Sequence, residues 1–141
     1  MGHPNMAAEE VVARYVEEAW NRGNIQIVDE LLTPGHVRRD SLLNEPVVGI
    51  ESVKAQIVSL KTGFPDFHFD VWIIPSANGE FVTRRWIMIG THLGTWRNIP
   101  PTGVSISSTG MAISRMEDGL IAEEWVQRDD LDLLRQIGAR E

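Results

Sequence analysis

His92 and Asp129 are the residues of this sequence whose types and positions best suit proton transfer. An imidazole exchanges a proton near neutral pH, so His92 is a candidate acid, base or hydrogen-bond donor. A carboxylate at the mouth of an apolar cavity can remove an acidic C–H proton, which makes Asp129 a candidate base. Each has a structural alternative: His92 as a hydrogen-bonded residue near a strand end, and Asp129 as a helix N-cap, for which Asp130 competes.

Aromatic and basic side chains near these two residues could complete a site. His92 shares its strand parity with Trp86, so both are expected on one side of a sheet. Arg85 and Arg128 could orient a carboxylate or an enolate oxygen, and surface ion pairing is the alternative for both. The predicted chemistry needs only acids, bases and a dry pocket.

Sequence motifs disfavour most cofactors and metals. The four histidines are far apart and form no His-x-His or His-x-x-x-His pair, so we expect no metal site. No glycine-rich nucleotide loop and no Gly-x-Ser-x-Gly elbow occurs, which argues against nucleotide cofactors and serine-triad chemistry. Without cysteine there is no disulfide, thiolate metal site or cysteine nucleophile. We therefore expect no cofactor.

Charge and hydropathy restrict the partners and the compartment. The formal net charge is −7 and no long lysine/arginine run offsets it, so nucleic acid is not an expected partner. No run of about 18 apolar residues predicts a membrane span, and residues 1–6 lack the pattern of a secretion signal. We expect a soluble, cytoplasmic protein with one domain over residues 7–141 and a disordered or tag-like N-terminus over residues 1–6.

Two hydrophobic periodicities divide the chain. The first half has helical spacing and predicts helices over 7–21, 25–32 and 50–63, with an extended piece over 36–43. From Phe67 onward the period is two, with turn signals between the runs. This pattern predicts an antiparallel meander and a short closing helix after Asp129 or Asp130. The strands are expected at 67–75, 80–93, 103–116 and 120–129.

Helices followed by a meander predict an α+β fold in which the helices cover one sheet face. Strands of this length should curl around the helices and enclose a conical cavity. One strand face is unusually small and would leave space if it faces inward; the alternative is that bulky side chains fill it. That face consists of Ser108, Gly110, Ala112 and Ser114.

Several short motifs, in their order and spacing, resemble the SnoaL-like polyketide cyclases, also called ester cyclases, over about residues 7–138. They are Val48-Gly49-Ile50-Glu51, Phe64-Pro65-Asp66, Gly90-Thr91-His92, Pro100-Pro101-Thr102-Gly103, Asp118-Gly119, Glu124-Trp125, Asp129 and Leu134-Arg135-Gln136-Ile137-Gly138. The resemblance implies a bacterial-type protein with the α+β cone of scytalone dehydratase and ketosteroid isomerase, in the nuclear transport factor 2-like superfamily. It further implies a homodimer with a hydrophobic pocket inside each cone and no cofactor.

The resemblance also implies a reaction. In the characterised cyclases an aspartate removes a proton from the carbon between a ketone and an ester, and the enolate closes a ring by aldol addition. Carried onto this sequence, the aspartate falls on Val126, its histidine on Ala112, a glutamine on Gly110 and an asparagine on Arg38. The chain therefore departs from the cyclases at all four positions, which together with Arg85 are expected to contact substrate.

Many uncharacterised relatives share His92, Trp125 and Asp129 with this chain. The resemblance therefore implies Asp129 as the base, His92 as the proton donor or oxyanion partner, and Trp125 with Trp86 as cavity walls.

Three functions follow as hypotheses. The first is a lyase or isomerase, like the polyketide cyclases, that acts on a small apolar or aromatic carbonyl compound. The second is a non-catalytic, dimeric small-molecule binder, favoured by the four departures. The third resembles an epoxide hydrolase, because relatives of the fold activate water with an aspartate-arginine-aspartate set and Arg128-Asp129-Asp130 supplies those residue types.

Overall fold

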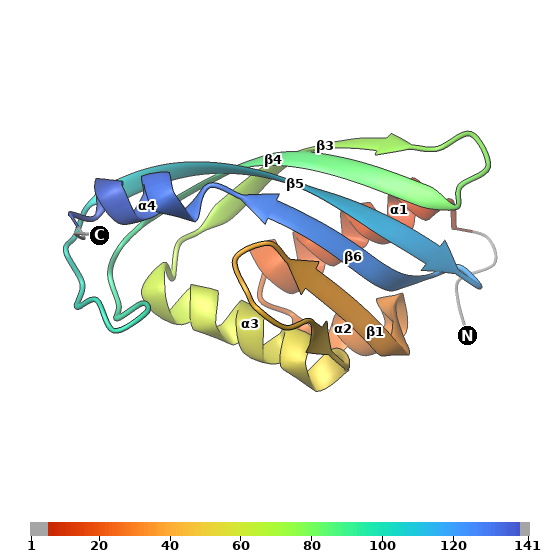
Figure 1. Ribbon diagram of the computed structural model, residues 1–141, viewed down its shortest axis with the longest axis horizontal. Helices are drawn as coiled ribbons and strands as arrows, with labels where there is room; N and C mark the ends of the chain where they lie inside the picture. Colours follow the sequence, from red (N-terminus) through yellow and green to blue (C-terminus); the bar gives the residue numbers. More distant parts are fainter. Residues whose placement is uncertain (1–5, 139–141) are drawn as a thin grey trace.

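The computed structural model describes residues 6–138 and consists of a curved six-stranded sheet with helices along its concave side (Figure 1). The strands lie in the order β2-β1-β6-β5-β4-β3. They are β1 (Leu32–Asp40), β2 (Val47–Val48), β3 (His68–Pro75), β4 (Phe81–Thr91), β5 (Ser105–Glu117) and β6 (Leu120–Arg128). The helical elements are α1 (Ala8–Arg14), η1 (Tyr15–Asn21), η2 (Ile25–Ile27), α2 (Val28–Leu31), α3 (Ile50–Gly63) and α4 (Asp130–Gln136).

The predicted antiparallel meander is confirmed as β3 to β6, in which each strand pairs with the next. The turns at Gly79 and at Asp118-Gly119 have the positive φ angles that tight connections need. The sheet also contains a pair that a period-two pattern does not predict: β1 runs parallel to β6. Such pairing joins segments far apart in the chain, so no local turn signal marks it.

The first predicted helix is confirmed in extent, but its second half, η1, is a π-helix. Its buried side chains follow the helical spacing of apolar residues on which the prediction rests: Tyr15, Val16, Ala19 and Trp20. A π-helical segment within an α-helix shifts the direction of the following side chains and is frequent at functional sites. Here it directs Trp20 into the interior of the cone.

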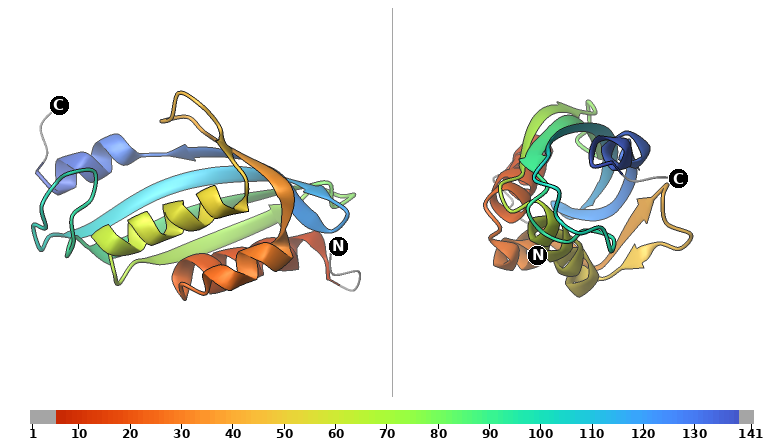
Figure 2. Two further views of the ribbon diagram at one scale, coloured as in Figure 1. Left: turned by 90° about the horizontal axis from the view of Figure 1, so that it is seen from below. Right: turned by 90° about the vertical axis from the view of Figure 1, so that its left-hand side faces the viewer.

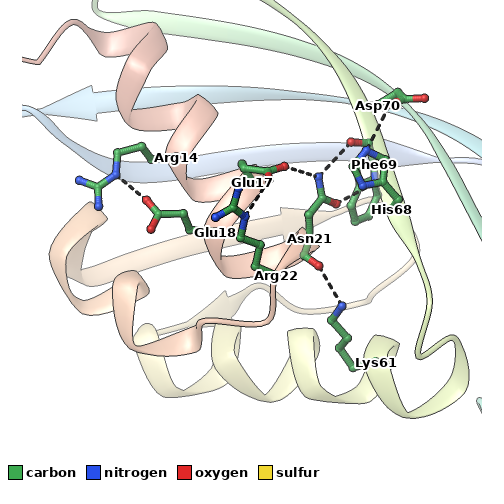
Figure 3. Close-up of polar contacts among 9 residues, drawn as sticks. All are labelled: Arg14, Glu17, Glu18, Asn21, Arg22, Lys61, His68, Phe69 and Asp70. Carbon is green, nitrogen blue, oxygen red and sulfur yellow. Dashed lines mark hydrogen bonds and ion pairs between the residues drawn. The ribbon is translucent and has the colours of Figure 1, made fainter.

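Asn21, the last residue of η1, fixes the helical layer to the sheet (Figure 3). Its side chain accepts from the backbone N–H of Phe69 at 2.8 Å and donates to the carbonyl of Phe69 at 3.1 Å, as a strand neighbour would. Its own carbonyl accepts from Nζ of Lys61 on α3 at 3.0 Å. One residue thus connects η1 with β3 and α3.

The small face of β5 lies inward and is filled in part. A Cβ added to Gly110 would lie 2.3 Å from Cζ2 of Trp86, so the indole occupies the space that a side chain at position 110 would need. Ala112 and Ser114 lie opposite Arg84 and Val82 of β4. Small residues on β5 therefore make room for the large inward residues of β4.

The sheet bends around α1 and α3, and α4 lies at the opposite end of the molecule from the start of α1 (Figure 2). No helix within residues 6–138 is long and apolar enough to cross a membrane. The predicted N-terminal segment 1–6 lies, except for Met6, outside the described residues.

Candidate functional site

A cavity of about 230 Å³ lies inside the cone, between the inner face of the sheet and helices η1, α3 and α4. Most of its wall is apolar or aromatic, with Val16, Trp20, Leu60, Phe69, Val71, Trp86, Met88, Trp96 and Leu133. Its charged lining consists of Arg38, Arg84, Arg97, Arg128 and Asp130. An apolar hollow with few convergent polar groups is the usual form of a small-molecule site.

Glu124 of β6 is fully buried behind this wall and anchors a group of polar side chains. Oε2 accepts from Nη2 of Arg84 at 2.7 Å, and Oε1 accepts from the Tyr15 hydroxyl at 3.1 Å. His36 Nε2 and Arg38 Nη1 lie 3.0 and 3.5 Å from Oε1. The carboxylate is therefore enclosed by donors contributed by four other residues.

The pKa values of this group follow from its burial and charges. Burial alone would raise the pKa of Glu124, but Arg84, the hydrogen bond from His36 and Arg38 hold it well below its usual range. Burial and the neighbouring Glu124 carboxylate raise the pKa of the Tyr15 phenol. Glu124 is thus a fixed anion that orients Arg84, and Arg84 also donates to Oγ of Ser114 at 3.1 Å.

A second charged group lies where β6 passes into α4. Arg128 Nη2 is 2.9 Å from Oδ2 of Asp40, and Arg128 Nε is 3.4 Å from Oδ2 of Asp130. Arg97, from the loop after β4, places Nη2 2.5 Å from the same Asp130 oxygen. Burial lowers the pKa of Arg128, although Asp130 and Asp40 oppose that effect. Two buried carboxylates therefore flank one guanidinium.

The structure places the predicted base Asp129 outside the cavity lining. Its side chain is the N-cap of α4 and accepts from the backbone N–H of Asp132 at 3.0 Å. This hydrogen bond supports the helix-cap alternative for Asp129. Asp130 is buried and lines the cavity instead.

His92 is fully buried but also lies outside the cavity lining. Its Nδ1 is 3.0 Å from Oγ1 of Thr102 and accepts from the Thr102 backbone N–H at 3.3 Å. We infer that the ring hydrogen is on Nε2, because Nδ1 is an acceptor. The imidazole lies near the Phe64 ring, with 5.4 Å between centroids. Its contacts therefore hold the loop that contains Trp96 and Arg97 against the end of α3.

The other predicted site residues divide between the two faces of the sheet. Trp86 and Arg38 line the cavity. Ala112 and Val126, which face each other across β5 and β6, are buried beneath the lining. Gly110 lies under the Trp86 indole.

Arg85 and Trp125 lie away from the cavity. Arg85 lies on the outer side of β4, with its guanidinium carbon 5.4 Å from the centre of the Trp72 ring. Trp125 is 38% exposed on β6. The structure therefore does not bring these two together with Trp86 and Arg38.

Sequence reasoning missed Asp40, Glu124 and Arg97 as members of the charged groups. Strand parity could have placed Glu124 and Arg128 on one face, because they lie four positions apart on β6. The burial of Asp130 has no such signal, since it depends on the angle at which α4 leaves the sheet. Within residues 6–138 no group of three or more His, Cys, Asp or Glu residues is arranged to hold a metal ion.

The fold and cavity define an α+β cone protein whose internal cavity is lined by acidic and basic as well as apolar side chains. The chain belongs to the SnoaL-like polyketide cyclase family, whose model matches residues 10–137. It is 27% identical over 134 residues to the aklanonic acid methyl ester cyclase DnrD of Streptomyces peucetius, which covers 94% of this chain and 92% of that protein. The aklanonic acid methyl ester cyclase DauD of Streptomyces sp. strain C5 is also 27% identical, over 90% of this chain and 80% of the relative.

Solved structures give the same result for the fold. A candidate SnoaL-like polyketide cyclase from Jannaschia sp. CCS1 superposes with a TM-score of 0.85 at 24% identity, covering 100% of this chain and 99% of that one. IdmH from Streptomyces antibioticus, a candidate polyketide cyclase, gives a TM-score of 0.80 at 27% identity, with 94% and 99% covered. The expected cone fold is confirmed.

Proposed function

We propose that this protein is a cofactor-independent acid–base enzyme, a cyclase, lyase or isomerase, that acts on a small apolar or aromatic carbonyl compound. The observation that supports this most is Asp130, a buried carboxylate in the wall of a cavity rich in aromatic side chains. Membership of the cyclase family supports the same class of reaction. Asp130 replaces Asp129 as the residue to which we assign the base.

The contacts of Asp130 suggest a different role for each of its two carboxylate oxygens. Arg97 and Arg128 both contact Oδ2, so we assign Oδ1 to the removal of a proton from a carbon beside a carbonyl group. The electrons of the broken C–H bond become an enolate. A guanidinium held in a site of low dielectric stabilises the charge on the enolate oxygen. We assign this role to Arg128 and Arg97, whose guanidiniums contact Asp130.

The enolate then has two outcomes that balance without a cofactor. In ring closure its carbon bonds to a second carbonyl carbon of the same molecule, and the new alkoxide takes the proton back from Asp130. In isomerisation the proton returns to a different carbon. Both outcomes return Asp130 to its starting state, and the enclosed wall limits competing protonation by water.

This assignment moves the base from the position that the resemblance implies. Val126 and Ala112 stand at the positions of the aspartate and histidine of characterised cyclases, and both are buried apolar residues. Arg128 and Asp130 lie farther along the chain, toward the α4 end of the cavity. The substrate would therefore react nearer that end.

Proton exchange tests the proposal independently of ring closure. Aklanonic acid methyl ester, the compound named for the two relatives, is incubated in D₂O, and NMR follows deuteration at the carbon between its carbonyl groups. We expect exchange above the buffer rate for the wild type and none above it for Asp130→Asn. Binding without exchange, by this compound and by simpler β-keto esters, would instead support the non-catalytic binder.

A second candidate, epoxide hydrolysis, is favoured by one observation. Asp40, Arg128 and Asp130 form a carboxylate-guanidinium-carboxylate arrangement, which differs from the consecutive residues that the sequence suggested. One carboxylate would take a proton from water as the water oxygen bonds to an epoxide carbon. The other residue, in its carboxylic acid form, would protonate the epoxide oxygen as the C–O bond breaks. Hydration of styrene oxide that is lost in both Asp40→Asn and Asp130→Asn would support this candidate over C–H abstraction.

A further inference from the structure

The buried charges around the cavity are unequally paired. Three guanidiniums, those of Arg38, Arg84 and Arg128, lie among three buried carboxylates, those of Asp40, Glu124 and Asp130, while Arg97 contacts Asp130 from the exposed loop after β4.

The ion-pair distances show which guanidinium is paired most weakly. Each carboxylate has a short partner: Arg84 lies 2.7 Å from Glu124, Arg97 2.5 Å from Asp130, and Arg128 2.9 Å from Asp40. Arg38 reaches only Glu124, at 3.5 Å.

Despite burial, Glu124 and Asp40 favour the charged form of Arg38 and raise its pKa, but they leave donors of the guanidinium without hydrogen-bond partners. Arg38 is only 4% exposed, and its Nε and Nη1 have no hydrogen-bond partner among the described residues. Its guanidinium carbon lies 5.2 Å from the centre of the Trp20 ring, which holds it in place beside the cavity without neutralising it. Buried N–H donors without partners are unfavourable, and an anionic acceptor that reaches them removes that cost.

We propose that the ligand of this cavity presents a carboxylate to Arg38, on a flat apolar frame that packs against Trp20 and Trp86. The proposal specifies the substrate class of the proposed enzyme and so rests on that function in part. The carboxylate is separate from the carbonyl group that reacts beside Asp130, so aklanonic acid methyl ester, whose acid group is esterified, serves in the exchange test as a surrogate that lacks it. Arg38 is the residue that selects acids over the corresponding esters, and it stands where the resemblance places a neutral asparagine.

Binding of matched probes tests the proposal without any need for turnover. The probes are 2-naphthoate, its methyl ester and acetate, titrated calorimetrically into the wild type, Arg38→Gln and Arg39→Gln. Arg39 is the control because it neighbours Arg38 on β1 but forms a surface ion pair with Glu123. We expect the wild type to prefer naphthoate over its ester by about tenfold or more, the effect of one hydrogen bond to a charged group.

The variants make the result specific to Arg38. Arg38→Gln should abolish the preference for naphthoate and Arg39→Gln should keep it. Equal binding of acid and ester by the wild type, no binding of either, or a preference that survives in Arg38→Gln would each overturn the proposal. If acetate bound as tightly as naphthoate, the proposed packing of a flat apolar frame against Trp20 and Trp86 would be wrong.

A second measurement needs no ligand. If the donors of Arg38 await a ligand, Arg38→Met in the ligand-free protein should melt at or above the wild-type temperature, because an apolar side chain of similar volume removes the buried unpartnered N–H groups. Arg84→Met should melt lower, since it deprives Glu124 of its closest partner. A melting temperature of Arg38→Met as far below the wild type as that of Arg84→Met would overturn the proposal. Loss of proton exchange in Asp130→Asn bears on the proposed reaction alone, so the two ideas can fail separately.

Discussion

Asp129 and Asp130 are adjacent in the chain, yet their carboxylates lie on different sides of the cavity wall. Asp129 is exposed and caps α4 through the backbone N–H of Asp132, whereas Asp130 is buried and contacts two guanidiniums inside. The transition from strand to helix separates them. Because the two differ by one position and share one chemistry, they form a matched pair for mutation.

Asp130→Asn is expected to abolish proton exchange at the substrate carbon, because an amide cannot accept the proton. Asp129→Asn is expected to keep it, since asparagine caps a helix as well as aspartate does. NMR exchange rates measure both, and circular dichroism reports whether each variant is folded. Activity lost in Asp129→Asn and retained in Asp130→Asn would restore the base that the sequence alone predicted.

Glu124 is expected to matter more for stability than any surface carboxylate of β6. Glu124→Gln leaves Arg84 and Arg38 without their buried anion, which we expect to cost about 3–5 kcal/mol of unfolding free energy. Its neighbour Glu123, which pairs with Arg39 and Arg115 near the surface, supplies the control. Glu123→Gln should cost at most about 1 kcal/mol in urea unfolding. Similar losses for the two variants would contradict the anchoring role of Glu124.

The same carboxylate predicts how stability depends on pH. The pKa of Glu124 is lowered in the folded protein, so its contribution is fully present above the unfolded value of about 4.3 and is lost as the pH falls through the folded value. The stability difference between the wild type and Glu124→Gln should therefore shrink in urea titrations below about pH 4. A difference that stays constant or grows on acidification would show that Glu124 is not held ionised.

The sequence predicted the elements well because their signals are local. The alternation of β3 to β6 and the apolar stripes of α1 and α3 each lie within one segment, so their bounds differ from the predicted ones by a few residues. The π-helical winding of η1 and the pairing of β1 with β6 depend on tertiary contacts. No local sequence pattern therefore predicts either feature.

The site was less predictable for a related reason. Trp86 and Arg38, two of the predicted substrate contacts, line the cavity, but the loop that carries Arg97 has no sequence signal that predicts it. Arg97 and Asn98 both have positive φ angles, of 48° and 63°, without a glycine to indicate such a turn. Histidine is a residue type often found in catalytic sites, but His92 contacts Thr102 and Phe64 and does not line the cavity. The sequence does not show these contacts, so it could not separate a catalytic role from a structural one.

Gly110 is expected to set the position of the Trp86 wall. In Gly110→Ala the new Cβ would lie 2.3 Å from the indole, so the ring must move, with an expected cost of about 1–3 kcal/mol. Gly35 is the control, because nothing lies within 4 Å of a Cβ there. Thermal unfolding and the fluorescence of bound 2-naphthoate measure the two effects. An unchanged melting temperature in Gly110→Ala would contradict the close packing of β4 on β5.

The outer face of the sheet is expected to form a homodimer. Trp72, Met111, Ile113 and Trp125 are 38–50% exposed, and Ile113 lies directly beside Trp125 across β5 and β6. Pairing two such faces would remove their apolar area from water. Ile113→Glu should therefore give a monomer by analytical ultracentrifugation, whereas Val58→Glu, at an exposed apolar residue of α3, should leave the dimer intact. A wild-type protein that sediments as a monomer at every concentration would contradict the dimer, and dissociation by Val58→Glu would move the interface from the sheet to the helices.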